Sequence, residues 1–210
     1  MEILQNLASY VLHIDKHLSL VIEQYGVWSY LFLFLVIFAE TGLVITPFLP
    51  GDSLLFAAGT FAAVGSFHIV WLFGLIFCAA VIGDSVNYAV GKMLGQTLME
   101  KYPRIVKKEY IERTQQFYAK YGGKTIVLAR FAPIVRTFAP FIAGVGRMNY
   151  GYFFLYNVVG GFLWTAVFVL GGYFFGNTPM VKENFSVVIL VIIVLSVIPA
   201  VVEFIKHRKR

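Results

Sequence analysis

The scarcity of charge in the first half of the chain constrains its fold more than any other feature. Between Glu23 and Lys92 lie 68 residues that carry only three formal charges. These are Glu40, Asp52 and Asp84. A membrane-spanning helix needs about 20 consecutive apolar residues, so this stretch has room for at least two membrane segments. The whole chain of 210 residues is 59% hydrophobic and 13% charged, which is more apolar than one globular core of this length can hide from water. We therefore predict an all-α integral membrane protein.

The distribution of basic residues indicates which parts of the chain face the cytoplasm. From Lys92 to Lys124 there are eleven charged residues, of which eight are basic. Because basic loops are retained in the cytoplasm, we place residues 92–124 and the basic C-terminus on that side. Residues 150–181 carry no charge at all. A multi-pass protein is expected, with transmembrane helices over residues 67–91, 150–176 and 185–205.

Two further segments are expected to enter the membrane and return. Residues 125–149 must begin and end on the cytoplasmic side, and Arg130, Pro133, Arg136 and Pro140 within them disfavour a continuous lipid-facing helix. Residues 27–65 show the same pattern of an apolar run broken by prolines. We predict two opposed re-entrant helical hairpins, related as the halves of an inverted repeat. The residues expected to break them are Pro47, Pro50, Gly51, Pro133, Pro140 and Gly144.

The remaining segments indicate contact with the membrane surface and no bound cofactor. Residues 1–25 have apolar side chains at helical spacing, and we predict an amphipathic helix along the interface. The single cysteine, Cys78, excludes an internal disulfide and every multi-cysteine metal site. No nucleotide-binding or hydrolase motif is present, so we expect neither cofactor nor metal. The basic loop 92–124 is interpreted as facing anionic lipid headgroups, not nucleic acid.

Acidic side chains inside apolar segments are candidate functional groups. Glu40 is expected to be protonated, paired with a base or exposed to a water-filled cavity; the alternative is a neutral side chain that hydrogen-bonds the broken backbone. Asp52 precedes an apolar run, where it is either a helix N-cap or a proton carrier at a wet hairpin tip. For Asp84 and Asn87, hydrogen bonding between helices and an accessory role in transport both stay open.

Arg130 and Arg136 are the strongest positive signal, because a guanidinium group keeps its charge at any working pH. Each needs an anion inside an otherwise uncharged segment. The candidates are Glu40 or Asp52 of the other hairpin, or a lipid phosphate, which arginine binds through two parallel hydrogen bonds. For Arg130, which lies near the basic loop, a side chain that extends to the interface is the alternative.

Three motifs taken together resemble the DedA family of membrane proteins. They are E-T-G-L-V-I-T-P-F-L-P-G-D-S from Glu40, G-D-S-V-N-Y from Gly83, and R-F-A-P-I-V-R-T-F-A-P-F-I-A-G from Arg130. The resemblance covers the whole chain, and this family shares its VTT (SNARE-associated) domain with eukaryotic lipid scramblases. It implies two opposed re-entrant hairpins in a bacterial inner-membrane protein that moves lipids between leaflets. The family's acidic functional positions fall on Glu40 and Asp52, and its basic ones on Arg130 and Arg136.

We therefore expect a lipid translocase and not an enzyme. In this hypothesis Arg130 and Arg136 bind the phosphate of a polyprenyl phosphate or a phospholipid, while Glu40 and Asp52 take up protons from the proton gradient. The first alternative is a proton-coupled antiporter for small ions or drugs, and the second is a non-catalytic membrane assembly factor. An intramembrane phosphatase ranks lower, because no histidine lies in either hairpin. A homo-oligomer is compatible with each of these functions.

Overall fold

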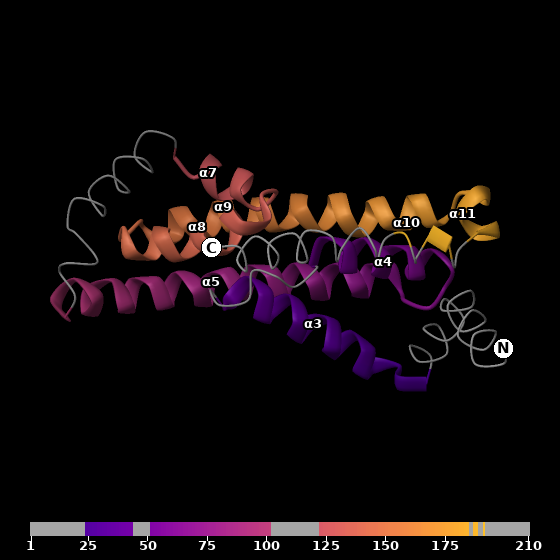
Figure 1. Ribbon diagram of the computed structural model, residues 1–210, viewed down its shortest axis with the longest axis horizontal. Helices are drawn as coiled ribbons and strands as arrows, with labels where there is room; N and C mark the ends of the chain where they lie inside the picture. Colours follow the sequence, from indigo (N-terminus) through magenta and orange to yellow (C-terminus); the bar gives the residue numbers. More distant parts are fainter. Residues whose placement is uncertain (1–23, 44–50, 102–121, 185–186, 189–190, 192–210) are drawn as a thin grey trace, which may run out of the picture. The chain divides into compact units, whose positions relative to one another are not determined.

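A computed structural model describes residues 24–43, 51–101, 122–184, 187–188 and 191, and every element within them is helical (Figure 1). Most of the predicted helices over 1–25 and 185–205 and the centre of the basic loop lie outside the described residues, as do Pro47 and Pro50. The elements are α3 (Val27–Gly42), α4 (Gly51–Ala63), α5 (Ile69–Lys101), α7 (Lys124–Ala129), α8 (Pro133–Val145), α9 (Tyr150–Thr165), the π-helix η1 (Ala166–Leu170), α10 (Gly171–Gly176) and α11 (Pro179–Glu183).

Two of the helical stretches are long and apolar enough to cross a membrane. One covers Ile69–Leu94 of α5, and the other covers Tyr150–Gly176 through α9, η1 and α10. Their 26 and 27 residues correspond to about 40 Å of helix, which exceeds the hydrocarbon core of about 30 Å. The prediction of an all-helical fold is therefore confirmed for the described part of the chain, and these two stretches have the length and composition of membrane spans. Because α5 continues to Lys101, the beginning of the predicted loop 92–124 is helical.

The two prolines of residues 125–149, Pro133 and Pro140, occupy different positions in α8. Residues 130–132 separate α7 from α8, and Pro133 is the first residue of α8, a position that tolerates its missing N–H. Pro140 lies inside α8, so the prediction that it breaks the hairpin is wrong. A proline inside a helix weakens the hydrogen bonds of the preceding turn. The side chain of Asn87 on α5 donates to the carbonyl of Thr137 in that turn, at 2.7 Å, which supplies a donor from a neighbouring helix.

Gly51 and Gly144 also occupy different positions within their helices. Gly51 begins α4, and the residues before it, 44–50, lie outside the described part of the chain. Gly144 lies inside α8, so the prediction that it breaks the hairpin is wrong. A Cβ at Gly144 would overlap the backbone carbonyl of Tyr88. The glycine is needed for the close approach of α8 to α5, and Val145 ends the helix.

The chain divides into two compact units. The first unit contains Met1–Leu33, Pro50–Leu75 and Thr165–Arg210, and the second contains Phe34–Leu49 and Ile76–Trp164. In the first unit, α4 packs against η1 and α10. In the second unit, α8 packs against α5 through glycines that approach the facing backbone.

The same glycine contact occurs once in each unit. In each unit, a glycine of the shorter helix, α4 or α8, faces a backbone carbonyl of the longer helical stretch, α9–η1–α10 or α5. A second glycine, three residues further along the longer stretch, faces the carbonyl of a phenylalanine of the shorter helix. The first unit uses Gly59 against Val169 and Gly172 against Phe56, and the second uses Gly144 against Tyr88 and Gly91 against Phe141. Each phenylalanine precedes the glycine of its own helix by three residues. The two units therefore contain the same local helix pairing.

Candidate functional site

Two buried arginine–carboxylate pairs lie in the second unit. Nη2 of Arg136 contacts Oε1 of Glu40, and their side chains are 7% and 1% exposed. Nη2 of Arg130 lies 2.5 Å from Oδ2 of Asp84, and these side chains are 4% and 5% exposed. Buried charges are costly unless they are paired and hydrogen-bonded. With all four groups ionised, the two positive and two negative charges cancel.

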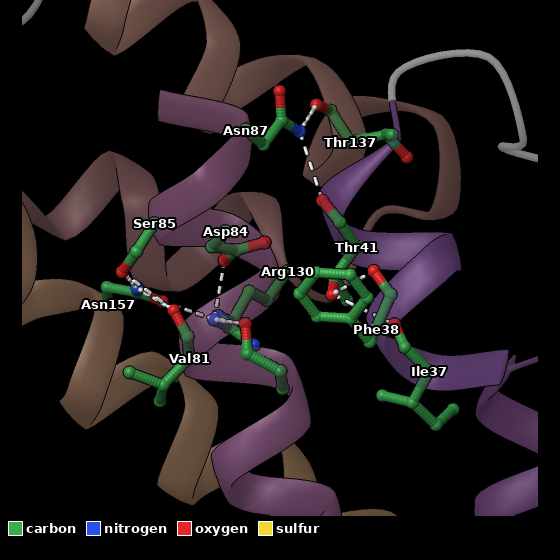
Figure 2. Close-up of polar contacts among 11 residues, drawn as sticks. Ile37, Phe38, Thr41, Val81, Asp84, Ser85, Asn87, Arg130, Thr137 and Asn157 are labelled. Carbon is green, nitrogen blue, oxygen red and sulfur yellow. Dashed lines mark hydrogen bonds and ion pairs between the residues drawn. The ribbon is translucent and has the colours of Figure 1, made fainter. Parts of the chain in front are cut away.

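Arg130 has an uncharged partner in addition to Asp84. It caps the C-terminal end of α7, and its Nη2 also donates to Oδ1 of Asn157 on α9 (Figure 2). The amide of Asn157 is oriented by its other end, because Nδ2 donates to the carbonyl of Val81 at 3.0 Å and to Oγ of Ser85 at 3.3 Å. The amide oxygen is thereby directed at the guanidinium group.

Arg136 likewise has an uncharged partner in addition to Glu40. It lies in the first turn of α8, and its guanidinium carbon is 5.1 Å from the ring centroid of Trp164 on α9. Trp164 is fully buried. A guanidinium group at this distance from an indole ring makes a cation–π interaction, which is strongest where water is excluded.

Asn87 connects the helices that carry these pairs. Its Nδ2 donates to the carbonyls of Thr41 on α3 and Thr137 on α8, at 3.1 and 2.7 Å (Figure 2). Among the polar atoms that are buried without a hydrogen-bond partner in the described part of the chain are Nε of Arg130, Oδ1 of Asn87 and Oγ1 of Thr137. Such atoms are uncommon in folded proteins, and they indicate capacity for a polar ligand or water.

The structure brings most of the predicted site residues together. Arg136 is paired with Glu40, one of the two protein carboxylates proposed for it, whereas Arg130 is paired with Asp84. Since the Arg130 side chain is buried, the alternative in which it extends to the interface is wrong. Asp52 belongs to the first unit and lies within the first turn of α4, half-buried.

Among the residues of the cluster that were not singled out from the sequence, Asn157 and Trp164 contact the two arginines. Asn157 is an amide within an uncharged span, where a polar side chain needs a partner on another helix, so its burial was foreseeable. Trp164 carries no such signal, because tryptophan is common in membrane helices near the interface. Within the described residues, no three His, Cys, Asp or Glu side chains gather to form a metal site.

Comparison with known proteins places the chain among membrane proteins. The VTT domain model matches residues 49–174. Protein DedA of Escherichia coli (strain K12) is 49% identical over 212 residues, which cover 100% of this chain and 97% of that protein. An uncharacterized membrane protein of Mycobacterium tuberculosis (strain ATCC 25618 / H37Rv) is 43% identical over 173 residues, 81% of this chain and 76% of its own length. The inner membrane protein YqjA of Escherichia coli (strain K12) is 34% identical over 152 residues, 72% and 69% of the two chains. No solved structure matches the chain.

Proposed function

This chain belongs to the DedA family of VTT-domain membrane proteins, and we propose that it is a translocase that moves a phosphate-bearing lipid between the leaflets of the membrane. The observation that carries the proposal is the presence of two buried arginines, Arg130 and Arg136, in one compact unit. A binding site for cations or neutral molecules does not require two fixed positive charges. A lipid phosphate is an anion that a guanidinium group binds through two parallel hydrogen bonds.

The proposed mechanism exchanges one counter-ion of an arginine for another. Glu40 holds Arg136 in the present arrangement, and protonation of Glu40 releases this arginine to a lipid phosphate. Loss of the proton on the other side of the membrane returns Arg136 to Glu40 and discharges the lipid. Asp52, in the first turn of α4, serves as a second proton carrier. The lipid tail stays in the bilayer, no covalent bond is broken, and the protein acts as a transporter and not as an enzyme.

Helix lengths support a membrane arrangement with two re-entrant hairpins. Helices α4 and α8 have 13 residues each, or about 20 Å of helix, which is too short for a hydrocarbon core of about 30 Å. The glycine contact repeated in both units supports an origin from an internal repeat. We propose that the hairpins enter the inner membrane from opposite sides, with the basic loop and the C-terminus in the cytoplasm.

Leaflet exchange in liposomes tests the proposed function. The purified chain is reconstituted with labelled polyprenyl phosphate or with a labelled glycerophospholipid, beside Arg136→Ala and Arg147→Ala. Arg147 is an exposed arginine that follows α8, and it provides a matched control. We expect wild type and Arg147→Ala to move one of the lipids, and folded Arg136→Ala to move neither.

Two results would overturn the proposal. If wild type moves neither lipid but dissipates a pH gradient when small ions are supplied, the protein is an ion antiporter. If Arg136→Ala moves lipid as fast as wild type, the buried arginine does not bind the headgroup.

A further inference from the structure

We propose that one face of α9 is a neutral cradle for both arginines, which keeps them in the site while their carboxylates are exchanged for a lipid phosphate. This guanidinium cradle consists of Asn157, Gly160, Gly161 and Trp164. The inference rests on the proposed function and adds to it the residues that position the two phosphate-binding groups.

Each arginine contacts one carboxylate and one uncharged side chain of α9, and Arg130 also donates to the carbonyl of Ala80 at 3.4 Å. Arg130 contacts Asp84 and Asn157, and Arg136 contacts Glu40 and the ring of Trp164. A phosphate that approaches a guanidinium group competes with a carboxylate for the same positive charge. An amide oxygen or an indole ring competes only weakly with the phosphate for this charge, because it carries no net charge. The uncharged contact therefore persists when the carboxylate leaves.

The spacing of the cradle residues places them on one face of α9. They occupy positions i, i+3, i+4 and i+7, which line up along one side of an α-helix. Asn157 and Trp164, at the two ends of the set, each contact one of the arginines. Neither side chain titrates, so the cradle does not change charge when protons bind elsewhere in the site.

Gly160 leaves space for the Arg130 side chain, whereas Gly161 leaves space mainly for Val81 and lies in ordinary contact distance of Arg130. A Cβ on Gly160 would lie 3.1 Å from Cδ of Arg130 and 3.1 Å from Cα of Val127. A Cβ on Gly161 would lie 3.6 Å from Cζ of Arg130 and 3.1 Å from Cγ2 of Val81. The first distance is shorter than ordinary carbon–carbon contact, so Gly160→Ala must displace Arg130 or the backbone of α7.

Substitutions in the guanidinium cradle should affect lipid binding differently from substitutions of residues that only pack the core. A packing residue changes the stability of the protein and its affinity for any lipid alike. A positioning residue changes the preference for a phosphate over the same lipid without one. The quantity to measure is therefore the ratio of the affinities for polyprenyl phosphate and for polyprenol, which we define as the phosphate selectivity.

Native mass spectrometry of the purified full chain in detergent, titrated with each of the two lipids, gives this ratio. The informative variants are Trp164→Leu, Trp164→Phe and Asn157→Leu. The matched control is Trp71→Leu, because Trp71 on α5 is an exposed tryptophan. Arg136→Ala is measured in the same series to test the phosphate site itself.

We expect Trp164→Leu and Asn157→Leu each to lower the phosphate selectivity about tenfold or more, the scale of one desolvated cation–π or charge-assisted contact. Trp164→Phe should lose less, since it keeps an aromatic ring, and Trp71→Leu should equal wild type. If folded Trp164→Leu and Asn157→Leu both keep the wild-type phosphate selectivity, the proposed cradle is overturned. Gly160→Ala, whose Cβ would lie 3.1 Å from Cδ of Arg130, should lower the phosphate selectivity as well. If Trp164→Leu or Asn157→Leu fails to fold, wild-type selectivity in both Trp164→Phe and Gly160→Ala overturns the cradle equally. Wild-type selectivity in Arg136→Ala would instead refute the proposed function.

Discussion

Replacing Asp84 by asparagine removes the charge of the carboxylate next to Arg130 and keeps the shape of the side chain. The two groups lie 2.5 Å apart, and both are buried. Loss of one partner from a buried ion pair costs about 3–5 kcal/mol, because the remaining charge is uncompensated. Asn157 still accepts a hydrogen bond from Arg130. We therefore expect Asp84→Asn to lower the free energy of unfolding by about 3 kcal/mol, the lower end of this range.

A double-mutant cycle separates the ion pair from other effects of the substitution. Asp84→Asn, Arg130→Gln and the double variant are unfolded reversibly in mixed micelles of increasing SDS content, and helicity is followed by circular dichroism. The double variant contains no charge in this pair, so its loss of stability should be smaller than the sum of the two single losses. A coupling energy of about 0.5–3 kcal/mol is typical of residues in direct contact. Glu183→Gln, at an exposed position, serves as the control and should change stability by less than about 0.5 kcal/mol.

Two outcomes would show that the Asp84 carboxylate does not stabilise the buried charge of Arg130. A loss below about 1 kcal/mol for Asp84→Asn would mean that Arg130 does not depend on this carboxylate. Strict additivity in the double variant would mean that the two side chains are not coupled. Either result would remove Asp84 from the site.

Three further predictions concern the packing and the proton coupling. Gly59→Ala should cost about 1–3 kcal/mol in the same unfolding assay, because its Cβ overlaps the carbonyl of Val169, whereas Gly74→Ala, which meets no atom within 4 Å, should be neutral or stabilising; equal effects would contradict the glycine contact. Asn87→Leu should cost about 1–3 kcal/mol by removing the donor shared by two carbonyls, and a stable variant would show that this bridge is dispensable. Glu40→Gln should weaken the dependence of lipid exchange in liposomes on an imposed pH gradient, and a dependence equal to that of wild type would exclude Glu40 as a proton carrier.

The sequence predicts the helical class and the buried charges well, because both follow from local composition. An uncharged run has few alternatives to a membrane helix, and an arginine within it requires an anion. The pairing of Arg136 with Glu40 was one of the anticipated arrangements. Composition alone does not choose between two carboxylates, however, since the choice depends on which helices meet.

Arg130 and Pro140 illustrate what the sequence leaves undetermined. The partner of Arg130 is Asp84, which lies 46 positions earlier in the chain and was predicted only as an accessory group. Pro140 was expected to break its hairpin, since the local rule is that proline disrupts helices. The helix continues, and the amide of Asn87 on α5 donates to the turn before the proline. Both differences come from contacts between helices that are distant in sequence.

The most direct test of the account measures lipid movement driven by protons. Liposomes that contain the full chain and labelled polyprenyl phosphate are given a pH gradient of one unit with the membrane potential clamped to zero, and the gradient is then reversed. One pH unit corresponds to about 1.4 kcal/mol per proton, or a tenfold bias of a one-proton exchange. In wild type we expect net movement of the lipid that changes direction with the gradient, and in Arg136→Ala we expect no such movement. Movement that ignores the gradient, or that persists without the arginine, would contradict the exchange of a carboxylate for a lipid phosphate.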